Sequence, residues 1–522
     1  MKREKKTMDG NQAAAHVAYA YTETAAIYPI TPASGMAEYM DEWSATGRKN
    51  IFNQTVKVIE MQSEAGAAGT VHGSLAAGAL TSTFTASQGL LLMLPNIYKI
   101  SGELLPGVFY VAARTIASHA LSIFGDHSDV YACRQAGAAM LCSCSVQEVM
   151  DLAPVAHIAS LKGKLPCIYF FDGFRTSHEI QKIDVWSNES LYKLMDFNAI
   201  EEFRNNSLNP YHQKIMGSSQ NPDIYFQNRE AANLCYENFP KIVKSIMNKI
   251  NDTIGTDYDL FNYYGDDNAE HIIIAMGSVC KTALETIKYL NIKGGKFGII
   301  KVRLYRPFCI KNFLEKIPDN VKQITVLDRT KEPGSVGEPL YLDVVAALRN
   351  SKFEKITVFS GRYGLSSKDT TPAQIAAVLY NNQKTRFTIG IIDDVTKLSL
   401  TNIENIDPLN YNIFQCKFWG LGGDGTISAN KSSIKIIGDN TNMQVQAYFE
   451  YDSKKSRGLT ISHLRFGNHS IHAPYLIKKA DFAACHNPVY MHKFNIVEEV
   501  KDGGIFLLNC GFKEDKLSEY LP

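Results

Sequence analysis

The stretch VKVIEMQSEAGAAGTVHGSLAAGALTSTFT, residues 56–85, contains a strand, a helix and a second strand in succession. Val56 to Ile59 is a short run with β-branched residues, which favours a buried strand. Glu64 to Leu80 has the length of a helix and is dense in Gly, Ala and Ser, and Thr81 to Thr85 again favours a strand. This succession predicts an α/β domain with a mostly parallel sheet.

The alternation continues on both sides of this stretch. Residues 11–26 favour a helix, and YPITP at residues 28–32 leads into another helical stretch. Apolar runs at 108–112 and 166–171 favour further strands, and residues 121–130 favour a loop. The first part of the chain is therefore expected to be one α/β domain.

Composition divides the rest of the chain. Residues 187–262 are rich in Asn and other polar residues and are expected to form a partly helical connector. HIIIAMGS, which starts at His271, begins a second alternation of strands and helices, and a polar stretch around Pro408 precedes a third. The expected domains are residues 1–258, 259–412 and 413–522, the last of them incomplete.

Charge and hydropathy exclude some classes of partner. The 522 residues carry a formal net charge of +1, which gives no electrostatic reason to expect nucleic acid or a membrane surface. The least polar stretch, residues 65–94, is broken by polar residues and lacks the ~18 apolar residues that a membrane span needs. No apolar segment follows the basic start, so no secretory signal is expected.

The ten cysteines are irregularly spaced and form no C-x-x-C pair. This spacing excludes a zinc ribbon or a ferredoxin-type cluster run, so no metal-ligand set is predicted in this chain. Free thiols in a reducing compartment are the expected state, which favours a cytoplasmic protein.

Two features of the sequence favour anion binding. Thr31 and Pro32 suit the N-cap and first position of a helix, whose free N–H groups attract carboxylates. Arg114 follows the strand predicted at 108–112, at the carboxyl end where parallel sheets bind ligands, and arginine can hold a carboxylate through two hydrogen bonds. A plain helix cap and a surface salt bridge remain the alternatives.

Glu64 begins a helix that contains Gly66, Gly69, Gly73 and Gly78. Each glycine weakens a helix by up to ~1 kcal/mol relative to alanine. Such a helix makes sense where another element or a planar ligand packs close to its backbone. The alternative for Glu64 is a favourable charge in a first helical turn.

Two further segments are open to more than one interpretation. His127 beside Asp126 suits acid–base chemistry or a structural role in a loop. GLGGDGTISANK, residues 420–431, resembles a phosphate-binding turn, but it lacks both the G-x-G-x-x-G spacing and the G-K-[ST] ending. Some anionic ligand is plausible there, and a nicotinamide dehydrogenase is disfavoured.

Long stretches in the same order resemble the pyruvate:ferredoxin (flavodoxin) oxidoreductase family over nearly the whole chain. The resemblance is weakest in the Asn-rich connector and at residues 401–412. It is carried by DGNQAAAHVAYAYTETAAIYPITP at 9–32, the segment at 60–93, HALSIFGDHSDVYACRQ at 119–135, VLDRTKEPGSVGEPLYLDV at 326–344, FTIGIIDDVTKLSL at 387–400 and FWGLGGDGTISANK at 418–431.

The resemblance implies roles for these residues. Glu64 matches the glutamate that bonds the aminopyrimidine of thiamine diphosphate, with Pro29 beside the cofactor. Thr31 and Arg114 match the residues that hold pyruvate. The implied reaction is the oxidative decarboxylation of pyruvate, with coenzyme A, to acetyl-CoA and CO₂, and the cofactor ring serves as the electron sink.

A coenzyme A site is also implied by the resemblance. It comprises Gly425, Thr426, Ile427, Ser428, Ala429, Asn430, Lys431, Lys455 and Ser456. The family pattern has glycine where this chain has Arg457, which puts the coenzyme A contacts there in doubt.

The resemblance further implies that this chain is an N-terminal portion. Members of the family run to more than twice this length and continue with the rest of the third domain, a domain with [4Fe-4S] clusters, and a domain that binds the cofactor diphosphate and Mg²⁺. The expected fold is a pyrimidine-type thiamine-diphosphate domain, a transketolase C-terminal-like domain and a truncated gamma-type domain. A homodimer that passes electrons to ferredoxin or flavodoxin is implied, and the isolated chain is expected to be inactive.

Two other interpretations remain. The chain could be a self-contained subunit of a multi-subunit 2-oxoacid:ferredoxin oxidoreductase. It could also be a non-catalytic anion-binding protein that keeps the fold, although the presence of Glu64 and Arg114 speaks against this.

Overall fold

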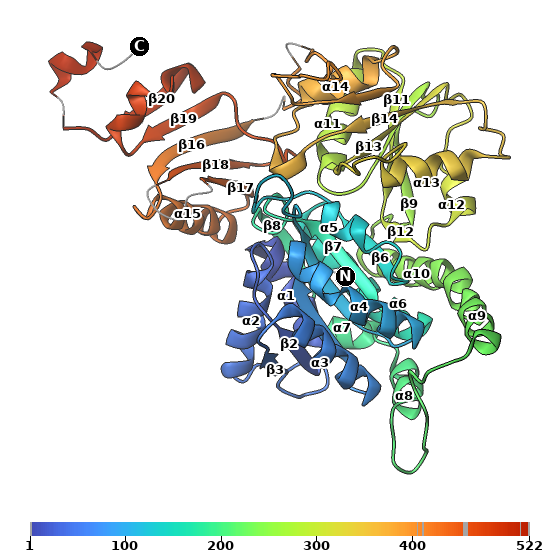
Figure 1. Cartoon of the computed structure of the whole chain (residues 1–522). Helices are drawn as coiled ribbons and strands as arrows, with labels where there is room; N and C mark the ends of the chain where they lie inside the picture. The colour runs from blue at the N-terminus through green and yellow to red at the C-terminus, as the bar shows by residue number, and fades with distance from the viewer. Residues whose placement is uncertain (1–2, 404–405, 410–411, 453–457, 512, 520–522) are drawn as a thin grey trace.

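The computed structural model describes residues 3–403, 406–409, 412–452, 458–511 and 513–519. Three sheets organise the chain. In Figure 1 the first unit, in blue to teal, lies at the bottom, the second, in yellow-green to light orange, at the upper right, and the third, in orange to red, at the upper left. None of the helices in the described ranges is long and apolar enough to cross a membrane.

The sheet of the first unit has seven strands in the order β12-β6-β7-β5-β4-β2-β3. All pair in parallel except β12, which comes from the second unit and runs antiparallel to β6. The central strands are buried along their whole length, as expected for parallel strands with helices on both faces. The strands are β2 Thr24–Ile27, β3 Lys57–Glu60, β4 Thr81–Thr85, β5 Val108–Ala113, β6 Ala139–Ser143, β7 Cys167–Asp172 and β12 Leu304–Arg306.

Six helices surround this sheet. They are α1 Gly10–Tyr21, α2 Ser34–Ala45, α3 Glu64–Ala76, α4 Ser87–Gly102, α5 Ser128–Ala132 and α6 Val146–Gly163. The single helix predicted over residues 11–26 is wrong at its end, because α1 stops at Tyr21 and β2 follows. Ala25 and Ala26 have high helix propensity, but their pairing with β3 and their complete burial override it.

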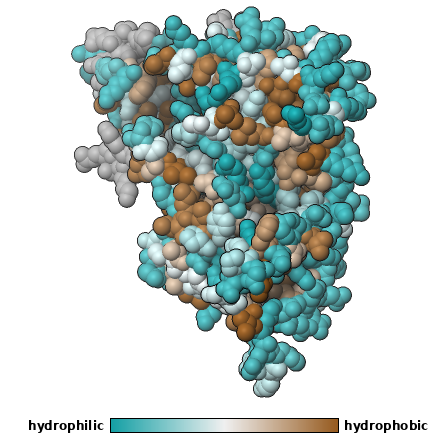
Figure 2. Space-filling view, turned by 45° about the vertical axis from the view of Figure 1, so that its right-hand side comes forward, coloured by the Kyte–Doolittle hydropathy of each residue, from teal (hydrophilic) through white to brown (hydrophobic). Residues whose placement is uncertain are grey.

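The Asn-rich connector contains α7 Asn188–Leu194, α8 Phe197–Asn205, α9 Pro222–Ala231 and α10 Asn233–Ile254. Helix α10 packs on α6 through Phe239, Val243 and Met247, whereas α9 buries none of its residues. Figure 1 shows α8 and α9 at the periphery of the molecule. Exposed apolar side chains elsewhere form separate patches among hydrophilic residues (Figure 2).

The second unit holds a six-stranded sheet in the order β15-β14-β13-β10-β11-β9, parallel except for β9. One of its two apolar clusters is continuous with the core of the first unit. The strands are β9 Phe261–Gly265, β10 His271–Ala275, β11 Phe297–Val302, β13 Gln323–Asp328, β14 Thr357–Arg362 and β15 Arg386–Thr388. The helices are α11 Val279–Ile292, α12 Ile310–Leu314, α13 Pro339–Leu348, the 3₁₀ turn η1 Leu365–Ser367 and α14 Pro372–Tyr380.

The third sheet combines strands from both ends of the chain, in the order β1-β8-β17-β18-β16-β19-β20. Glu4–Asp9 (β1) and Ile180–Val185 (β8) pair with each other, and β8 pairs with β17. The other strands are β16 Ile413–Leu421, β17 Gln444–Tyr451, β18 Leu459–Gly467, β19 Ala480–Cys485 and β20 Val500–Leu508. Helix α15 Thr426–Asn440 and the 3₁₀ turns η2 Pro488–His492, η3 Val497–Glu499 and η4 Glu514–Glu519 complete it.

This third sheet ties the two ends of the chain together. The boundaries expected after residues 258 and 412 stay predictions, since β1 and β8 lie within the expected first domain but belong to the sheet of the third unit.

Candidate active site

The predicted site residues lie along one edge of the first sheet. Thr31 follows β2, Glu64 follows β3 and Arg114 follows β5, so all three are at the carboxyl ends of parallel strands. Pro29 lies in the same loop as Thr31 and is exposed. Parallel α/β sheets bind their ligands at this edge.

Arg114 and Thr31 are in direct contact. The Nη1 of Arg114 donates a hydrogen bond of 2.8 Å to the Thr31 carbonyl oxygen, and its Nε lies 3.4 Å from the Ser122 carbonyl oxygen. Burial lowers the pKa of the Arg114 guanidinium, which nonetheless remains a strong base. The guanidinium is thus a cation fixed at the edge of the sheet.

The prediction that Thr31 and Pro32 begin a helix is wrong. Residues 31–33 form a turn, closed by a hydrogen bond of 2.8 Å from the Ala33 N–H to the Ile30 carbonyl, and α2 begins only at Ser34. Pro32 instead packs next to Gly173, which follows β7. Thr31 is exposed, and within the described part of the chain its hydroxyl makes no hydrogen bond, which leaves it available to a ligand.

Glu64 is a buried carboxylate at the start of α3. The Ser63 hydroxyl caps this helix by accepting from the Gly66 N–H at 3.1 Å, so Glu64 occupies the first turn, where the helix dipole favours negative charge. Glu64 is 6% exposed, and its carboxylate forms no hydrogen bond or ion pair with the residues that the structure describes. Buried carboxylates normally have a partner, so this one is free to bond a ligand.

Gly89 makes room for the Glu64 carboxylate. A Cβ on Gly89 would lie 2.8 Å from Glu64 Oε1 and 2.6 Å from Thr85 Oγ1. Both distances are shorter than a van der Waals contact. The Glu64 carboxylate can therefore lie where it does only because residue 89, in the first turn of α4, has no side chain.

Asp129 connects the Arg114 and Glu64 sides of the site. Its Oδ2 accepts hydrogen bonds from the backbone N–H of Arg114, at 2.9 Å, and of Ser87, at 2.8 Å. Ser87 begins α4, the helix that carries Gly89. Burial raises the pKa of Asp129 to about 7, although its backbone hydrogen bonds act in the opposite direction. Asp129 was not among the predicted site residues, because an acidic residue in a first helical turn carries no distinguishing signal.

His127 has a structural role in this geometry. Its Nε2 lies 2.6 Å from Asp172 Oδ1, and its backbone N–H donates to the Arg329 carbonyl at 2.9 Å. The Asp172 carboxylate also accepts from Arg329 Nη1 at 2.9 Å and from the Ser278 N–H at 2.8 Å. Burial by itself raises the pKa of Asp172, but the charge interactions with Arg329 and His127 hold it well below its usual range. This cluster joins the first unit to the second.

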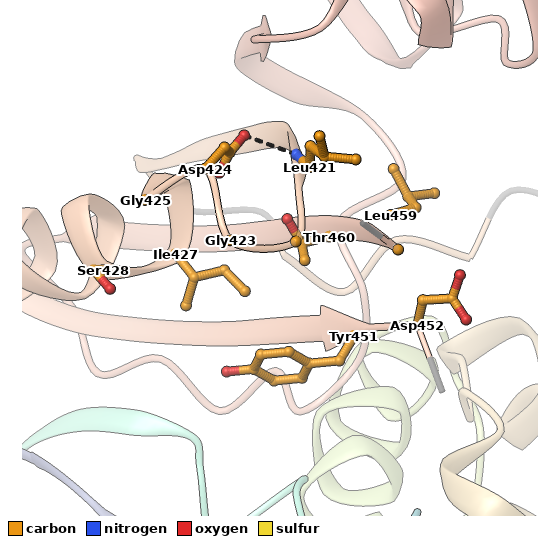
Figure 3. Close-up of a pocket in the computed structure, with 12 residues that line it drawn as sticks. Leu421, Gly423, Asp424, Gly425, Ile427, Ser428, Tyr451, Asp452, Leu459 and Thr460 are labelled. Atoms are coloured by element: carbon orange, nitrogen blue, oxygen red, sulfur yellow. Dashed lines mark hydrogen bonds between the residues drawn. The ribbon is translucent and has the colours of Figure 1, made fainter. Parts of the chain in front are cut away.

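A second candidate site lies in the third unit, as a cavity of 320 Å³ where the Gly-rich turn meets β17 and β18 (Figure 3). Figure 3 shows Ile427 and Ser428 on α15 and Tyr451 at the end of β17 around this cavity. It is lined by Leu421, Gly422, Gly423, Asp424, Gly425, Ile427, Ser428, Tyr451, Asp452, Gly458, Leu459 and Thr460.

The Gly-rich turn is closed by its own aspartate. Asp424 accepts hydrogen bonds from the N–H of Leu421 at 2.7 Å and of Thr426 at 2.8 Å, and Gly425 adopts φ +89°, a left-handed conformation that suits glycine. The amides of Ile427 and Ser428, in the first turn of α15, are not engaged by any described residue.

Only part of the predicted coenzyme A segment faces the cavity. Gly425, Ile427 and Ser428 line it, whereas Thr426 and Asn430 are buried and Ala429 is exposed outside its lining. Lys431 points elsewhere, with its Nζ 5.5 Å from the ring centroid of Phe449. The predicted Lys455 and Ser456, together with Arg457, lie outside the described residues.

Within the described ranges, no group of three or more His, Cys, Asp or Glu residues is arranged to hold a metal ion. All ten cysteines are free thiols.

The first unit, with its parallel sheet, buried Glu64 carboxylate and fixed Arg114, is of the thiamine-diphosphate-binding type, because residues 16–248 match the family model "Pyruvate flavodoxin/ferredoxin oxidoreductase, thiamine diP-bdg". Residues 269–375 match "Pyruvate:ferredoxin oxidoreductase core domain II", and residues 415–522 match "Pyruvate ferredoxin/flavodoxin oxidoreductase". The chain belongs to the pyruvate:ferredoxin/flavodoxin oxidoreductase family. The predicted multi-domain α/β fold class is confirmed.

Curated relatives match almost the whole chain. It is 59% identical to pyruvate:ferredoxin oxidoreductase from Moorella thermoacetica, over 99% of this chain and 44% of the relative. It is 57% identical to pyruvate-flavodoxin oxidoreductase from Enterobacter agglomerans, over the same shares of the two chains. It is also 51% identical to pyruvate dehydrogenase [NADP(+)] from Cryptosporidium parvum, over 99% of this chain and 27% of that protein. The chain therefore spans less than half the length of these relatives.

Among solved structures, the chain is similar to a 2-oxoglutarate:ferredoxin oxidoreductase from Magnetococcus marinus, with a TM-score of 0.52 and 18% identity. The match covers 71% of this chain and 64% of the other. It supports the fold alone.

Proposed function

We propose that this chain supplies the substrate-binding and cofactor-activating side of an active site that oxidatively decarboxylates pyruvate. In this proposal coenzyme A accepts the acetyl group and ferredoxin or flavodoxin accepts the electrons. The proposal rests on the arrangement of Glu64 and Arg114 at one edge of the sheet, a buried carboxylate without a partner among the described residues and a fixed cation.

The Glu64 carboxylate suits the aminopyrimidine of thiamine diphosphate. It is buried, has no partner among the described residues, and lies against the bare backbone of Gly89. When bound, thiamine diphosphate supplies a nucleophilic carbon and an electron sink for the decarboxylation. The role of Glu64 is to bond a ring nitrogen and hold a proton there, because a buried carboxylate makes a strong charge-assisted hydrogen bond. Pro29, in the loop after β2, would border the same space.

Arg114 and Thr31 suit the binding of a 2-oxoacid. One edge of the guanidinium is held by the Thr31 carbonyl, so the remaining N–H groups are oriented towards a carboxylate or a keto oxygen. The Thr31 hydroxyl is exposed beside it and can donate a second hydrogen bond. Fixed donors of this kind orient the substrate and cost no rearrangement when it binds.

The cavity of the third unit suits part of coenzyme A. Backbone amides of Ile427 and Ser428 at the start of α15 can bind a phosphate oxygen, while Ile427 and Tyr451 provide apolar surface for the rest of the ligand. The Asp424 carboxylate already accepts the N–H groups of Leu421 and Thr426, so these two amides are not available to an anionic ligand.

The remaining parts of the proposal concern what lies outside these 522 residues. Mg²⁺, the cofactor diphosphate and the [4Fe-4S] clusters would be held by other domains or chains, and the assembly would be a homodimer. A cytoplasmic location agrees with ten free thiols.

The test is made on the purified holoenzyme that contains this chain. Pyruvate, thiamine diphosphate and coenzyme A should together give acetyl-CoA and reduce a low-potential acceptor such as methyl viologen, and omission of any one should abolish the signal. Turnover of another 2-oxoacid with no turnover of pyruvate would refute the substrate assignment. Ser428→Asp should raise the KM for coenzyme A without changing the KM for pyruvate, and Ser432→Asp, which is exposed on α15 outside the cavity lining, is the matched control.

A further inference from the structure

A short loop of the second unit contacts the loop that carries Arg114. The Ser366 and Ser122 hydroxyl oxygens are 2.6 Å apart. Gly125 and Ser367 exchange two hydrogen bonds, in which the Gly125 N–H donates to the Ser367 hydroxyl and the Ser367 N–H donates to the Gly125 carbonyl, both at 2.8 Å. These contacts link residues about 240 positions apart in the sequence, across the junction of two units.

The loop of the second unit adopts a backbone conformation that side-chain-bearing residues rarely take. Gly364, Ser366 and Ser367 have φ of +63°, +54° and +55°. Arg329 holds the start of this loop by a hydrogen bond of 3.0 Å from its Nε to the Gly364 carbonyl. Strained backbone of this kind persists only where surrounding contacts determine it, and it is concentrated at functional sites.

Ser122 connects Ser366 to Arg114. Its carbonyl oxygen accepts from Thr115 Oγ1 at 2.9 Å and lies 3.4 Å from Arg114 Nε. The Thr115 N–H donates to the Phe124 carbonyl at 3.1 Å, so both ends of the loop are joined at its base. Residues 117–121, at its tip, are exposed.

We propose that Ser366 and Ser367 of the second unit are positioning residues for Arg114, which they hold through the base of the 115–125 loop. This inference rests on the proposed function, in which Arg114 binds the substrate carboxylate. Figure 1 shows the second unit directly above α5, next to which this loop lies. The second unit would then take part in substrate binding without touching the substrate.

The hydroxyl hydrogen bonds between the two units are better suited to orienting the Arg114 loop than to holding the units together. The two units already share a continuous apolar core, which supplies the affinity between them. A neutral hydrogen bond adds little net stability but is directional, and each of these bonds is aimed at the base of the Arg114 loop.

The first experiment measures amide hydrogen exchange across residues 114–125 in the holoenzyme. Ser122→Ala and Ser366→Ala should each accelerate exchange at Thr115 about fivefold, the effect of losing one net hydrogen bond. Phe124 is not used as the probe, because its N–H donates to the Ser122 hydroxyl at 3.2 Å and loses this bond directly in Ser122→Ala. At Thr115 the double variant should be no faster than either single variant, because both remove the Ser122–Ser366 contact. Ser122→Thr keeps a hydroxyl and should restore slow exchange, and Ser118→Ala, on the exposed tip, is the matched control.

The second experiment measures steady-state kinetics with the same variants. The KM for pyruvate should rise about fivefold in Ser122→Ala and Ser366→Ala, with kcat and the KM for coenzyme A unchanged. Ser366→Gly relieves the left-handed backbone and should raise the thermal midpoint relative to Ser366→Ala, yet raise the KM for pyruvate equally. A merely structural contact would move stability and KM together.

The outcomes separate this inference from the proposed function. Unchanged exchange in both alanine variants, or additive effects in the double variant, overturns the inference. Faster exchange with an unchanged KM for pyruvate also overturns it, while leaving the proposed function intact. If the unmodified holoenzyme does not turn over pyruvate, the proposed function fails, and exchange still decides whether the second unit holds the loop.

Discussion

The Arg114 guanidinium and the Thr31 carbonyl oxygen are joined by a hydrogen bond of 2.8 Å, which connects the end of β5 to the turn after β2. These strands are not neighbours, because β4 lies between them. The contact therefore spans β4 and brings the Thr31 hydroxyl and the free edge of the guanidinium to one place at the carboxyl edge.

The substitution Arg114→Lys tests whether the guanidinium binds Thr31 and the substrate carboxylate at the same time. Lysine keeps the charge but loses the planar fork, so it cannot both bond Thr31 and offer two parallel donors to a carboxylate. We expect kcat/KM for pyruvate to fall roughly 10- to 100-fold in the holoenzyme, mostly through KM. Arg134→Lys, in a partly exposed pair with Glu332, is the control and should leave these constants unchanged. Wild-type kinetics in Arg114→Lys would exclude a bidentate role.

Gly89→Ala should displace the Glu64 carboxylate while leaving the residue at position 64 unchanged. The added methyl group would lie 2.8 Å from Glu64 Oε1, so the carboxylate must move. We expect kcat and thiamine diphosphate affinity to fall about as far as in Glu64→Gln, by roughly 100-fold in kcat. Gly102→Ala, at the other end of α4, meets nothing within 4 Å and should behave as wild type. Full activity of Gly89→Ala would contradict the proposed place of the cofactor.

The sequence predicted strands and helices well where periodicity and length agreed. Strand β4, which contains three threonines, was predicted with its exact bounds, and α3 with its first residue, although α3 ends at Ala76 and not at Leu80. The predictions failed where tertiary contacts determine the local structure. In β2, for example, the alanines favour a helix by propensity but form a strand because they pair with β3. The Thr31–Pro32 cap failed for the same reason, because that turn is set by its contacts with Arg114 and Gly173.

The site was predictable only in part. Glu64 and Arg114 are recognisable from their places after strands, whereas Asp129 and Asp172 act through partners far along the chain. Ser366 is the extreme case, because its partner Ser122 lies 244 residues away and two serines carry no motif. The pairing of β8 with β17 likewise could not be predicted, since the local sequence of a strand does not indicate which distant strand it pairs with.

Asp129 should give the protein a measurable pH dependence. Burial raises its pKa from 3.8 to about 7 in the folded protein, so between these pH values the folded state keeps a proton that the unfolded state has lost. Stability must therefore fall as pH rises across this window. Asp129→Asn removes the titration, and we expect its thermal midpoint to gain roughly 3–5 °C relative to wild type between pH 5 and pH 8. Asp328, with a similar pKa, is present in both proteins and cancels in the comparison. Parallel curves for the two proteins would show that Asp129 is ionised throughout.

Asp172→Asn should destabilise the junction between the first unit and the second. The Asp172 carboxylate binds Arg329, His127 and the Ser278 N–H in a fully buried cluster, and its pKa is held well below the usual range. Asparagine leaves the Arg329 guanidinium buried without a counter-charge, which typically costs ~3–5 kcal/mol. We expect a lower urea midpoint and faster amide exchange along residues 364–367, because Arg329 also holds the Gly364 carbonyl. Glu189→Gln, which breaks a solvent-exposed pair with Lys193, is the control and should leave the midpoint in place. If Asp172→Asn unfolds like wild type, the junction is held by its shared apolar core, and the ion cluster only orients the two units.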